Sequence, residues 1–164
     1  MARADWLEAG ATLVAGGGAA ALTVDRLCAL VGKTKGAFYH HFGAMPAFEQ
    51  ALLEHWREAN LSRVEDAAPG GSLEELAVGL SIGLEGAVRR WSAVHPAARA
   101  AVEAVDRQRI AWLTQELAQE LDATERAGDY ALIEYAAFLG LLDLLPVEEL
   151  PRLTALLRDK IAAS

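Results

Sequence analysis

The sequence contains very little of what builds strands, disulfides or membrane anchors. Among its 164 residues Cys28 is the single cysteine, so no intrachain disulfide forms and nothing indicates an oxidising compartment. On the apolar face of a predicted helix, Cys28 is expected to be a small buried hydrophobic residue rather than a redox switch. Val, Ile and Thr are scarce, and Ala and Leu dominate, which favours helix over strand.

The sequence also lacks the segments that direct a chain to or through a membrane. It has no basic leader followed by an apolar stretch, and no uninterrupted apolar run of about 18 residues. We therefore expect a cytoplasmic protein with no membrane partner.

The chain has fewer basic than acidic residues, and this imbalance is confined to one part of the chain. The formal net charge is −8, which argues against nonspecific binding of nucleic acid by the whole surface. Residues 1–57 contain five basic and five acidic side chains, whereas residues 58–164 contain ten and eighteen. Only the first third is thus electrostatically able to approach phosphate groups closely.

Apolar spacing, caps and stop signals predict an all-α fold of about nine helices. We expect a helix-turn-helix domain over residues 1–44 and a helical regulatory and dimerisation domain over residues 45–164, with a connecting helix over 45–65. The predicted helices span residues 3–15, 24–31, 35–41, 45–65, 72–94, 96–121 (a short turn that merges into a long helix), 124–145 and 147–162.

Several of these helices have recognisable ends or faces. Gly16–Gly18 is expected to stop the first helix, and Leu27, Leu30 and Val31 are expected to form one apolar face of the second. Ser72 and Glu75 form a capping-box pattern at the start of the predicted 72–94 helix. The helix predicted over 124–145 is apolar nearly all round, so it must be covered on more than one side. A second copy of the chain is the simplest cover for the second side.

Residues 22–48 predict a helix-turn-helix, in which two short helices flank a tight turn at Gly32. Thr23 and Thr34 are expected to cap the two helices and to meet phosphate groups. Lys35 is the long donor positioned to reach a guanine edge or a phosphate, while the small Gly36 and Ala37 let the backbone approach the bases.

The aromatic residues of the second short helix divide into two sets. Phe38 and Phe42 stand at i and i+4, so they are expected to face inward and hold the helix on its neighbours. Tyr39 and His40 then point outward, as phosphate donors or in contact with a thymine methyl group. Two alternatives are a plain helical hairpin whose aromatics are only core, and exposed Tyr39 and His40 side chains without a role.

The stretch GKTKGAFYHHF, Gly32 to Phe42, resembles the motif of the TetR (tetracycline-repressor) family of bacterial transcription regulators. Residues 87–141, with Arg90, Trp91, Pro96, Asp106, Arg109 and Gly140, look like the regulatory domain of one TetR subgroup. The resemblance implies a ligand-responsive regulator, most often a repressor, that binds a palindromic double-stranded DNA operator. It also implies a homodimer joined through the last two helices, about 124–145 and 147–162, and a small-molecule site in the C-terminal domain.

The chain departs from the family pattern directly after Phe42. Where the family usually has a small polar cap and a lysine that reaches phosphate, this chain has Ala44, Met45 and Pro46. Each lost charge-assisted phosphate contact removes roughly one unit from the salt dependence of binding. A competing hypothesis is therefore a TetR-fold sensor or protein-interaction dimer in which DNA binding is weakened or lost.

Nothing in the sequence points to catalysis, a metal or a cofactor. His40 and His41 diverge by about 100° around a helix, so they cannot chelate one ion together. No glycine-rich loop follows a strand, and no serine or cysteine nucleophile has a base beside it. We expect no enzyme activity, no metal site and no cofactor.

The effector site is predicted from position alone. Three of the four tryptophans are expected on three different helices of the C-terminal part, where they form either core or the wall of a cavity: Trp56, Trp91 and Trp112. Asp106 and Arg109, at i and i+3, are either a structural ion pair or part of the lining of the effector cavity. The predicted site consists of Trp56, Trp91, Trp112, Tyr135 and Phe138, with Arg109, Gln115 or Glu134 as polar groups, and would take a small apolar or aromatic effector.

Overall fold

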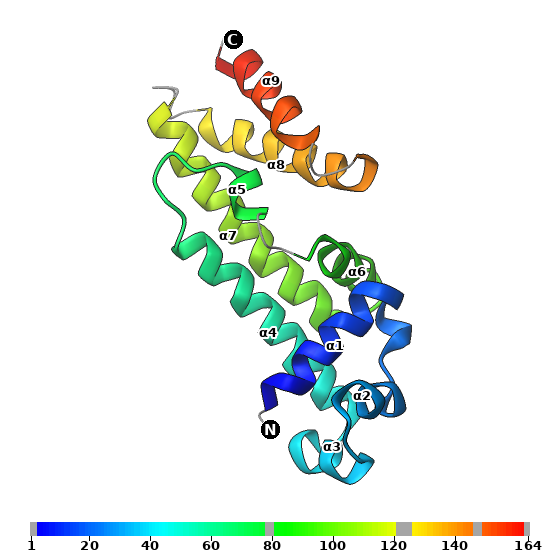
Figure 1. Cartoon of the computed structure of the whole chain (residues 1–164). Helices are drawn as coiled ribbons and strands as arrows, with labels where there is room; N and C mark the ends of the chain where they lie inside the picture. The colour runs from blue at the N-terminus through cyan, green and yellow to red at the C-terminus, as the bar shows by residue number, and fades with distance from the viewer. Residues whose placement is uncertain (1–2, 78–80, 121–125, 146–148, 163–164) are drawn as a thin grey trace. The chain divides into compact units, whose positions relative to one another are not determined.

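The computed structural model describes residues 3–77, 81–120, 126–145 and 149–162. Within these ranges every regular element is helical, which confirms the predicted all-α fold (Figure 1). The elements are α1 (Arg3–Gly17), the 3₁₀ turn η1 (Ala19–Ala21), α2 (Val24–Val31), α3 (Lys35–Phe42), α4 (Met45–Glu65), α5 (Leu73–Ala77), α6 (Ile82–Ser92), α7 (Pro96–Glu120), α8 (Ala127–Leu144) and α9 (Leu150–Ala162).

The chain forms two compact units, and two helices contribute residues to both. One unit consists of Met1–Asn60 and Ser81–Val105, and the other of Leu61–Leu80 and Asp106–Ser164. Helices α4 and α7 therefore each continue from one unit into the other. The predicted division after residue 44 separates the DNA-binding segment from the rest of the chain, and it stays a prediction.

In the first unit, α1 packs along α6 and α2, and α2 packs against α3. The close contact between α1 and α6 places the Ala15 carbonyl oxygen 3.3 Å from the position that a Cβ on Gly83 would occupy. Helix α1 extends to Gly17, two residues beyond its predicted end, and the chain leaves the helix at Gly18 with φ 68°. Only the third glycine therefore breaks the helix, because only its conformation is left-handed.

The predicted helix over 72–94 is wrong, because the structure has two helices in this range. Its predicted start is correct: the Glu75 N–H donates to Ser72 Oγ at 3.2 Å, and the Ser72 N–H donates to Glu75 Oε2 at 3.0 Å. Helix α5 is described only to Ala77, and a new helix begins with Ser81 as its cap. Ser81 Oγ accepts a hydrogen bond from the Leu84 N–H, so a second local cap competes with continuous helix.

In the second unit, α8 and α9 pack against each other, and their inner faces join α5 and α7 in one apolar core. The starts predicted at 124 and 147 lie outside the described residues. Pro151 falls in the first turn of α9, where a missing N–H costs little. The core consists mainly of Val64, Leu73, Leu76, Trp112, Leu113, Leu117, Tyr130, Tyr135, Phe138 and Leu150.

Among the helices of the described ranges, none combines the length and the apolar character needed to cross a membrane.

Candidate nucleic-acid interface

Helices α2 and α3 are each capped by a threonine, as predicted. Thr23 Oγ1 accepts a hydrogen bond from the Arg26 N–H at 3.3 Å, and Thr34 Oγ1 accepts one from the Ala37 N–H at 3.4 Å. Between the two helices Gly32 adopts the left-handed conformation, with φ 68° and ψ 34°. A side chain at this position would be strained, so the glycine allows the sharp turn that separates the two helices.

The inner side of α3 is held by aromatic contacts. Phe38 is fully buried and Phe42 nearly so, which confirms their predicted orientation. The Phe38 ring lies 5.6 Å from the Trp6 ring of α1 and 5.5 Å from the Phe48 ring of α4, measured between centroids. Helix α3 is therefore fixed by side chains from the helices on both sides of it in the sequence.

Gly10 of α1 contributes to the same packing, and sequence reasoning did not identify it. A Cβ on Gly10 would lie 2.7 Å from Phe48 Cζ and 3.2 Å from Leu52 Cδ2. Real Cβ atoms do not approach carbon this closely, so only glycine lets α1 meet α4 at this distance. The available signal was a glycine in the middle of a predicted helix. Glycine weakens a helix, so its presence there suggests that close packing requires it.

The outer side of α3 carries the side chains that were predicted to meet DNA. Lys35, Gly36, Tyr39 and His40 are exposed, and Ala37 is half-buried. Tyr39 exposes 49% of its surface, an unusual exposure for a large aromatic residue. Thr23 and Thr34 are also exposed, so their hydroxyl groups can serve as caps and still be reached from outside.

Lys35 has an intramolecular partner that was not predicted. Its Nζ lies 2.7 Å from Oδ1 of Asp25 in the first turn of α2. The hydrogen bond to Asp25, together with the charge of that carboxylate, raises the pKa of Lys35. Both side chains are largely exposed, so the pair is screened by solvent and readily exchanged for another partner.

The predicted apolar face of α2 is wrong at one position. Leu27 is fully buried and Val31 is half-buried, but Leu30 exposes 53% of its surface. Helix α2 has only eight residues, and the side of it that its neighbours cover is too narrow to include Leu30. Cys28 is half-buried rather than buried, so its side chain is only partly covered.

Comparisons with known proteins bear on both the N-terminal segment and the whole chain. The family model described as bacterial regulatory proteins of the tetR family matches residues 7–51. A Rhodococcus sp. protein assigned to the TetR-family transcriptional regulators aligns with TM-score 0.74 and 18% identity, over 98% of each chain. Salmonella enterica GusR aligns with TM-score 0.72 and 18% identity, over 98% of this chain and 93% of its own. No curated protein sequence matches.

The family match contains all of α2 and α3 and the first part of α4. It therefore includes the two threonine caps and the contact between Phe38 and Phe48 that holds α3 on α4. The chain has the TetR-family fold. The predicted resemblance is thereby confirmed, by the family model for residues 7–51 and by the solved structures for the fold of the whole chain. In this TetR-type domain α3 is the second helix of the helix-turn-helix, the one that enters the major groove in such motifs.

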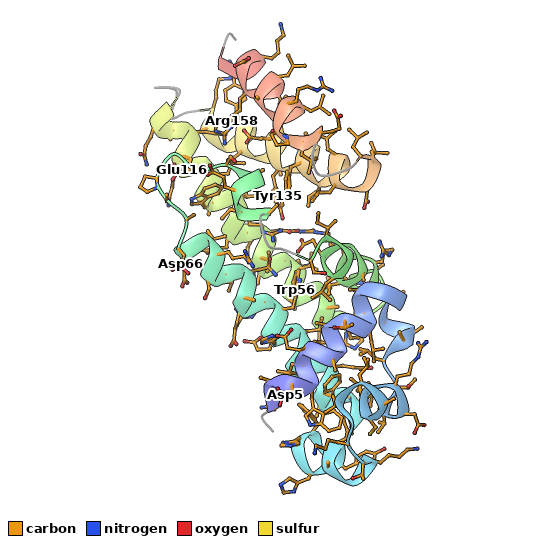
Figure 2. All side chains as sticks on the ribbon, in the orientation of Figure 1. Asp5, Trp56, Asp66, Glu116, Tyr135 and Arg158 are labelled. Atoms are coloured by element: carbon orange, nitrogen blue, oxygen red, sulfur yellow. The ribbon has the colours of Figure 1, made fainter. Side chains whose placement is uncertain are left out.

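The residues predicted to form the effector site are divided between the two units, so their grouping stays a prediction. Trp56 and Trp91 are buried in the first unit, not in the C-terminal part expected for them. Figure 2 labels Trp56 on α4. In the second unit Gln115 is exposed. The remaining predicted residues of that unit, Arg109, Trp112, Glu134, Tyr135 and Phe138, are all buried.

The buried polar groups of this set are held by other protein groups. The Tyr135 hydroxyl donates to Asp106 Oδ1 at 2.6 Å and accepts from Arg109 Nη1 at 3.3 Å. Tyr135 thus links the two residues that the sequence had placed at i and i+3 as an ion pair or cavity lining. Their shared partner on α8 lies 26 residues beyond Arg109, so helical spacing alone could not have indicated it.

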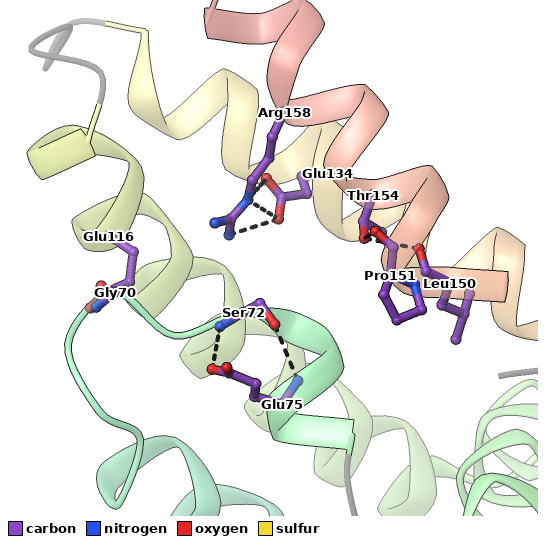
Figure 3. A network of polar contacts seen from close by, with 9 residues as sticks. All are labelled: Gly70, Ser72, Glu75, Glu116, Glu134, Leu150, Pro151, Thr154 and Arg158. Atoms are coloured by element: carbon purple, nitrogen blue, oxygen red, sulfur yellow. Dashed lines mark hydrogen bonds and ion pairs between the residues drawn. The ribbon is translucent and has the colours of Figure 1, made fainter. Parts of the chain in front are cut away.

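Glu134 is paired with Arg158, which sequence reasoning missed. Arg158 Nε donates to both Glu134 carboxylate oxygens, at 3.0 and 3.2 Å, and joins α9 to α8 (Figure 3). The Glu134 side chain is 1% exposed, and a buried carboxylate requires such a partner. An acid directly between the apolar residues Ile133 and Tyr135 was the signal for this pair, but nothing local to Glu134 identified Arg158.

Proposed function

We propose that this protein is a ligand-responsive transcription regulator that binds a palindromic DNA operator as a homodimer and represses transcription. The observation that carries the proposal is the outer face of α3. It exposes Lys35, Tyr39 and His40 on a helix whose other side is locked by Phe38. A rigid helix with small residues at its start and exposed donors along it fits a major groove.

Charge supports the same assignment of roles. The chain is neutral over residues 1–57 and carries its whole net charge of −8 in residues 58–164. Phosphate repulsion is therefore weakest at the TetR-type domain. Two such domains in one dimer would place their recognition helices roughly 34–36 Å apart, one helical turn of DNA.

The homodimer is supported by the outer faces of α8 and α9. Leu132, Ile133 and Leu156 each expose more than half of their surface, and Leu144 exposes 78%. Large apolar side chains exposed on two helices that pack against each other are typical of a surface that another chain covers. Because the same two helices would meet in both subunits, a two-fold symmetric interface is the simplest arrangement.

A specific observation favours a second candidate, a TetR-fold sensor with weakened DNA binding. Helix α4 begins at Met45 with Pro46 in its first turn, and no lysine stands there to meet a phosphate. The nearby lysine of α3, Lys35, is itself engaged by Asp25. This candidate predicts that the Lys35→Ala and Tyr39→Ala variants leave every biological readout unchanged.

The two candidates are separated by a gel-shift assay with the DNA upstream of the protein's own gene. The regulator predicts a discrete complex with a palindromic fragment that a scrambled duplex of equal length does not compete away. It also predicts that binding weakens steeply as salt is raised. Absence of a specific complex even at low salt would refute operator binding and leave the sensor.

A further inference from the structure

The second unit contains an open hollow of about 450 Å³ that includes only one residue of the predicted effector site. Its wall is formed by Arg63 at the end of α4, Asp66 in the turn that follows, Ser72 and Glu75 at the start of α5, and Trp112 of α7. This volume is within the range of small-molecule sites.

The wall of the hollow is held in place by its own hydrogen bonds. Ser72 and Glu75 cap each other at the start of α5, as described above (Figure 3). The Gly70 N–H donates to Glu116 Oε2 of α7 at 2.6 Å, which ties the preceding loop to a long helix. These hydrogen bonds hold the wall of the hollow in one arrangement, so little ordering is needed when a ligand binds.

Gly71 keeps the hollow open between the loop and Trp112. A Cβ at this position would lie 3.3 Å from Trp112 Cζ2 and 3.0 Å from the Ala68 carbonyl oxygen. Any side chain at residue 71 would therefore press on the aromatic wall. The absence of one leaves an edge of the indole at the hollow, although Trp112 is 8% exposed overall.

The side chains around the hollow combine an aromatic ring with an excess of negative charge. Asp66 and Glu75 are exposed carboxylates, Arg63 is half-buried, and the lining therefore carries a net charge of −1. The surrounding part of the chain is also acidic. An indole edge beside carboxylates suits a cation that carries an apolar group, because the apolar group packs against the ring and the charge is attracted by the carboxylates.

We propose that this hollow binds small organic cations with a flat apolar part, such as arylalkylammonium ions. The ring lies against Trp112, and the ammonium group meets the carboxylates of Asp66 and Glu75. The inference names the ligand class of the proposed regulator, and it depends on the proposed function only for the effect of that ligand on DNA.

The test uses the full chain without DNA and three probes that differ in charge. Phenethylammonium, 2-phenylethanol and 3-phenylpropionate share a phenyl ring on a short chain and carry charges of +1, 0 and −1. Isothermal titration calorimetry is expected to show saturable one-to-one binding of phenethylammonium and no binding of 3-phenylpropionate.

Two variants remove the charge of a lining side chain and keep its shape. Asp66→Asn and Glu75→Gln should each raise the dissociation constant of phenethylammonium by about three- to fivefold. Glutamine still accepts the Ser72 N–H, so Glu75→Gln leaves the capping box intact. The matched control is Glu65→Gln, an exposed acid of α4 outside the lining, which should leave binding unchanged.

Three outcomes would overturn the inference: no saturable binding of phenethylammonium at millimolar concentration, equal or tighter binding of 3-phenylpropionate, or equal weakening by Glu65→Gln. A gel shift without amine reports operator binding separately. Loss of the operator complex would therefore refute the proposed function, whereas failure of the titration would refute only the ligand site.

Discussion

Lys35 Nζ of α3 lies 2.7 Å from Asp25 Oδ1 of α2, so the cation proposed to meet DNA already has a carboxylate beside it. The hydrogen bond raises the pKa of Lys35, which keeps its charge at every pH used to measure DNA binding. A DNA phosphate has to compete with Asp25 for this ammonium group, and Asp25 itself repels the phosphate. Asp25 is therefore expected to limit operator affinity.

Replacing Asp25 by asparagine should strengthen operator binding. The Asp25→Asn variant removes a negative charge from the proposed interface and frees Lys35, so the dissociation constant should fall by about two- to fivefold. Fluorescence anisotropy with labelled operator measures the change. Glu58→Gln, an exposed acid on α4, is the charge-matched control. Weaker binding by Asp25→Asn would mean that Asp25 orients Lys35 for DNA rather than restraining it.

Removing the lysine should change the salt dependence of binding. If Lys35 neutralises a phosphate, Lys35→Ala lowers the slope of log K against log salt by about one unit. Arg107→Ala, which removes an exposed cation from α7, should leave the slope unchanged. An unchanged slope in Lys35→Ala would show that Lys35 does not meet a phosphate.

Two glycines of α1 should respond to alanine in opposite directions. Gly10→Ala places a methyl group 2.7 Å from Phe48 Cζ, and such overpacking destabilises by about 1–3 kcal/mol. At Gly16 nothing lies within 4 Å of the added Cβ, so Gly16→Ala should stabilise by up to about 1 kcal/mol through helix propensity. Urea unfolding measures both free energies. The same sign for both variants would contradict the packing described for α1 and α4.

The ion pair between α8 and α9 should be costly to break from one side. Arg158→Met removes the guanidinium and leaves the buried Glu134 carboxylate without it, which destabilises by about 3–5 kcal/mol. The double variant Glu134→Met/Arg158→Met should recover much of this loss, because no charge then stays buried. Chemical denaturation of Arg158→Met, Glu134→Met and the double variant measures the coupling. A loss in the double variant equal to the sum of the two single losses would refute it.

The outer face of α8 should determine the oligomeric state. Ile133 is 52% exposed, so Ile133→Glu leaves the fold of one chain intact but places a charge in the proposed interface. Sedimentation velocity should show a dimer for the natural chain and a monomer for the variant. The matched control is Ala29→Glu, at an exposed position of α2 outside this face. A monomeric natural chain would contradict the dimer proposal.

Local patterns predicted the parts of the fold that local forces determine. The caps at Thr23 and Thr34 and the capping box at Ser72 are contacts over three residues, so spacing alone revealed them. The inward position of Phe38 likewise follows from helical periodicity. These features positioned α2 and α3, and with them the candidate interface.

Features that depend on distant residues escaped prediction. The partners of Lys35 and Glu134 stand on other helices, 10 and 24 residues away in the sequence, and no periodic pattern connects them. Leu30 was placed on one apolar face with Leu27 and Val31, but periodicity does not indicate how much of such a face the neighbouring helices cover. The residues predicted for the effector site are not all in one unit for the same reason. Trp56 and Trp112 are both tryptophans, but they belong to different units.

The most direct test of the account is photo-crosslinking from residue 39 to DNA. A photoreactive phenylalanine derivative at Tyr39 should crosslink to bases inside the palindromic operator, because this side chain lies on the exposed face of α3. The same group at Glu58, exposed on α4, should give no crosslink. Crosslinks from residue 39 that are absent, or no stronger than those from residue 58, would contradict the placement of α3 in the groove.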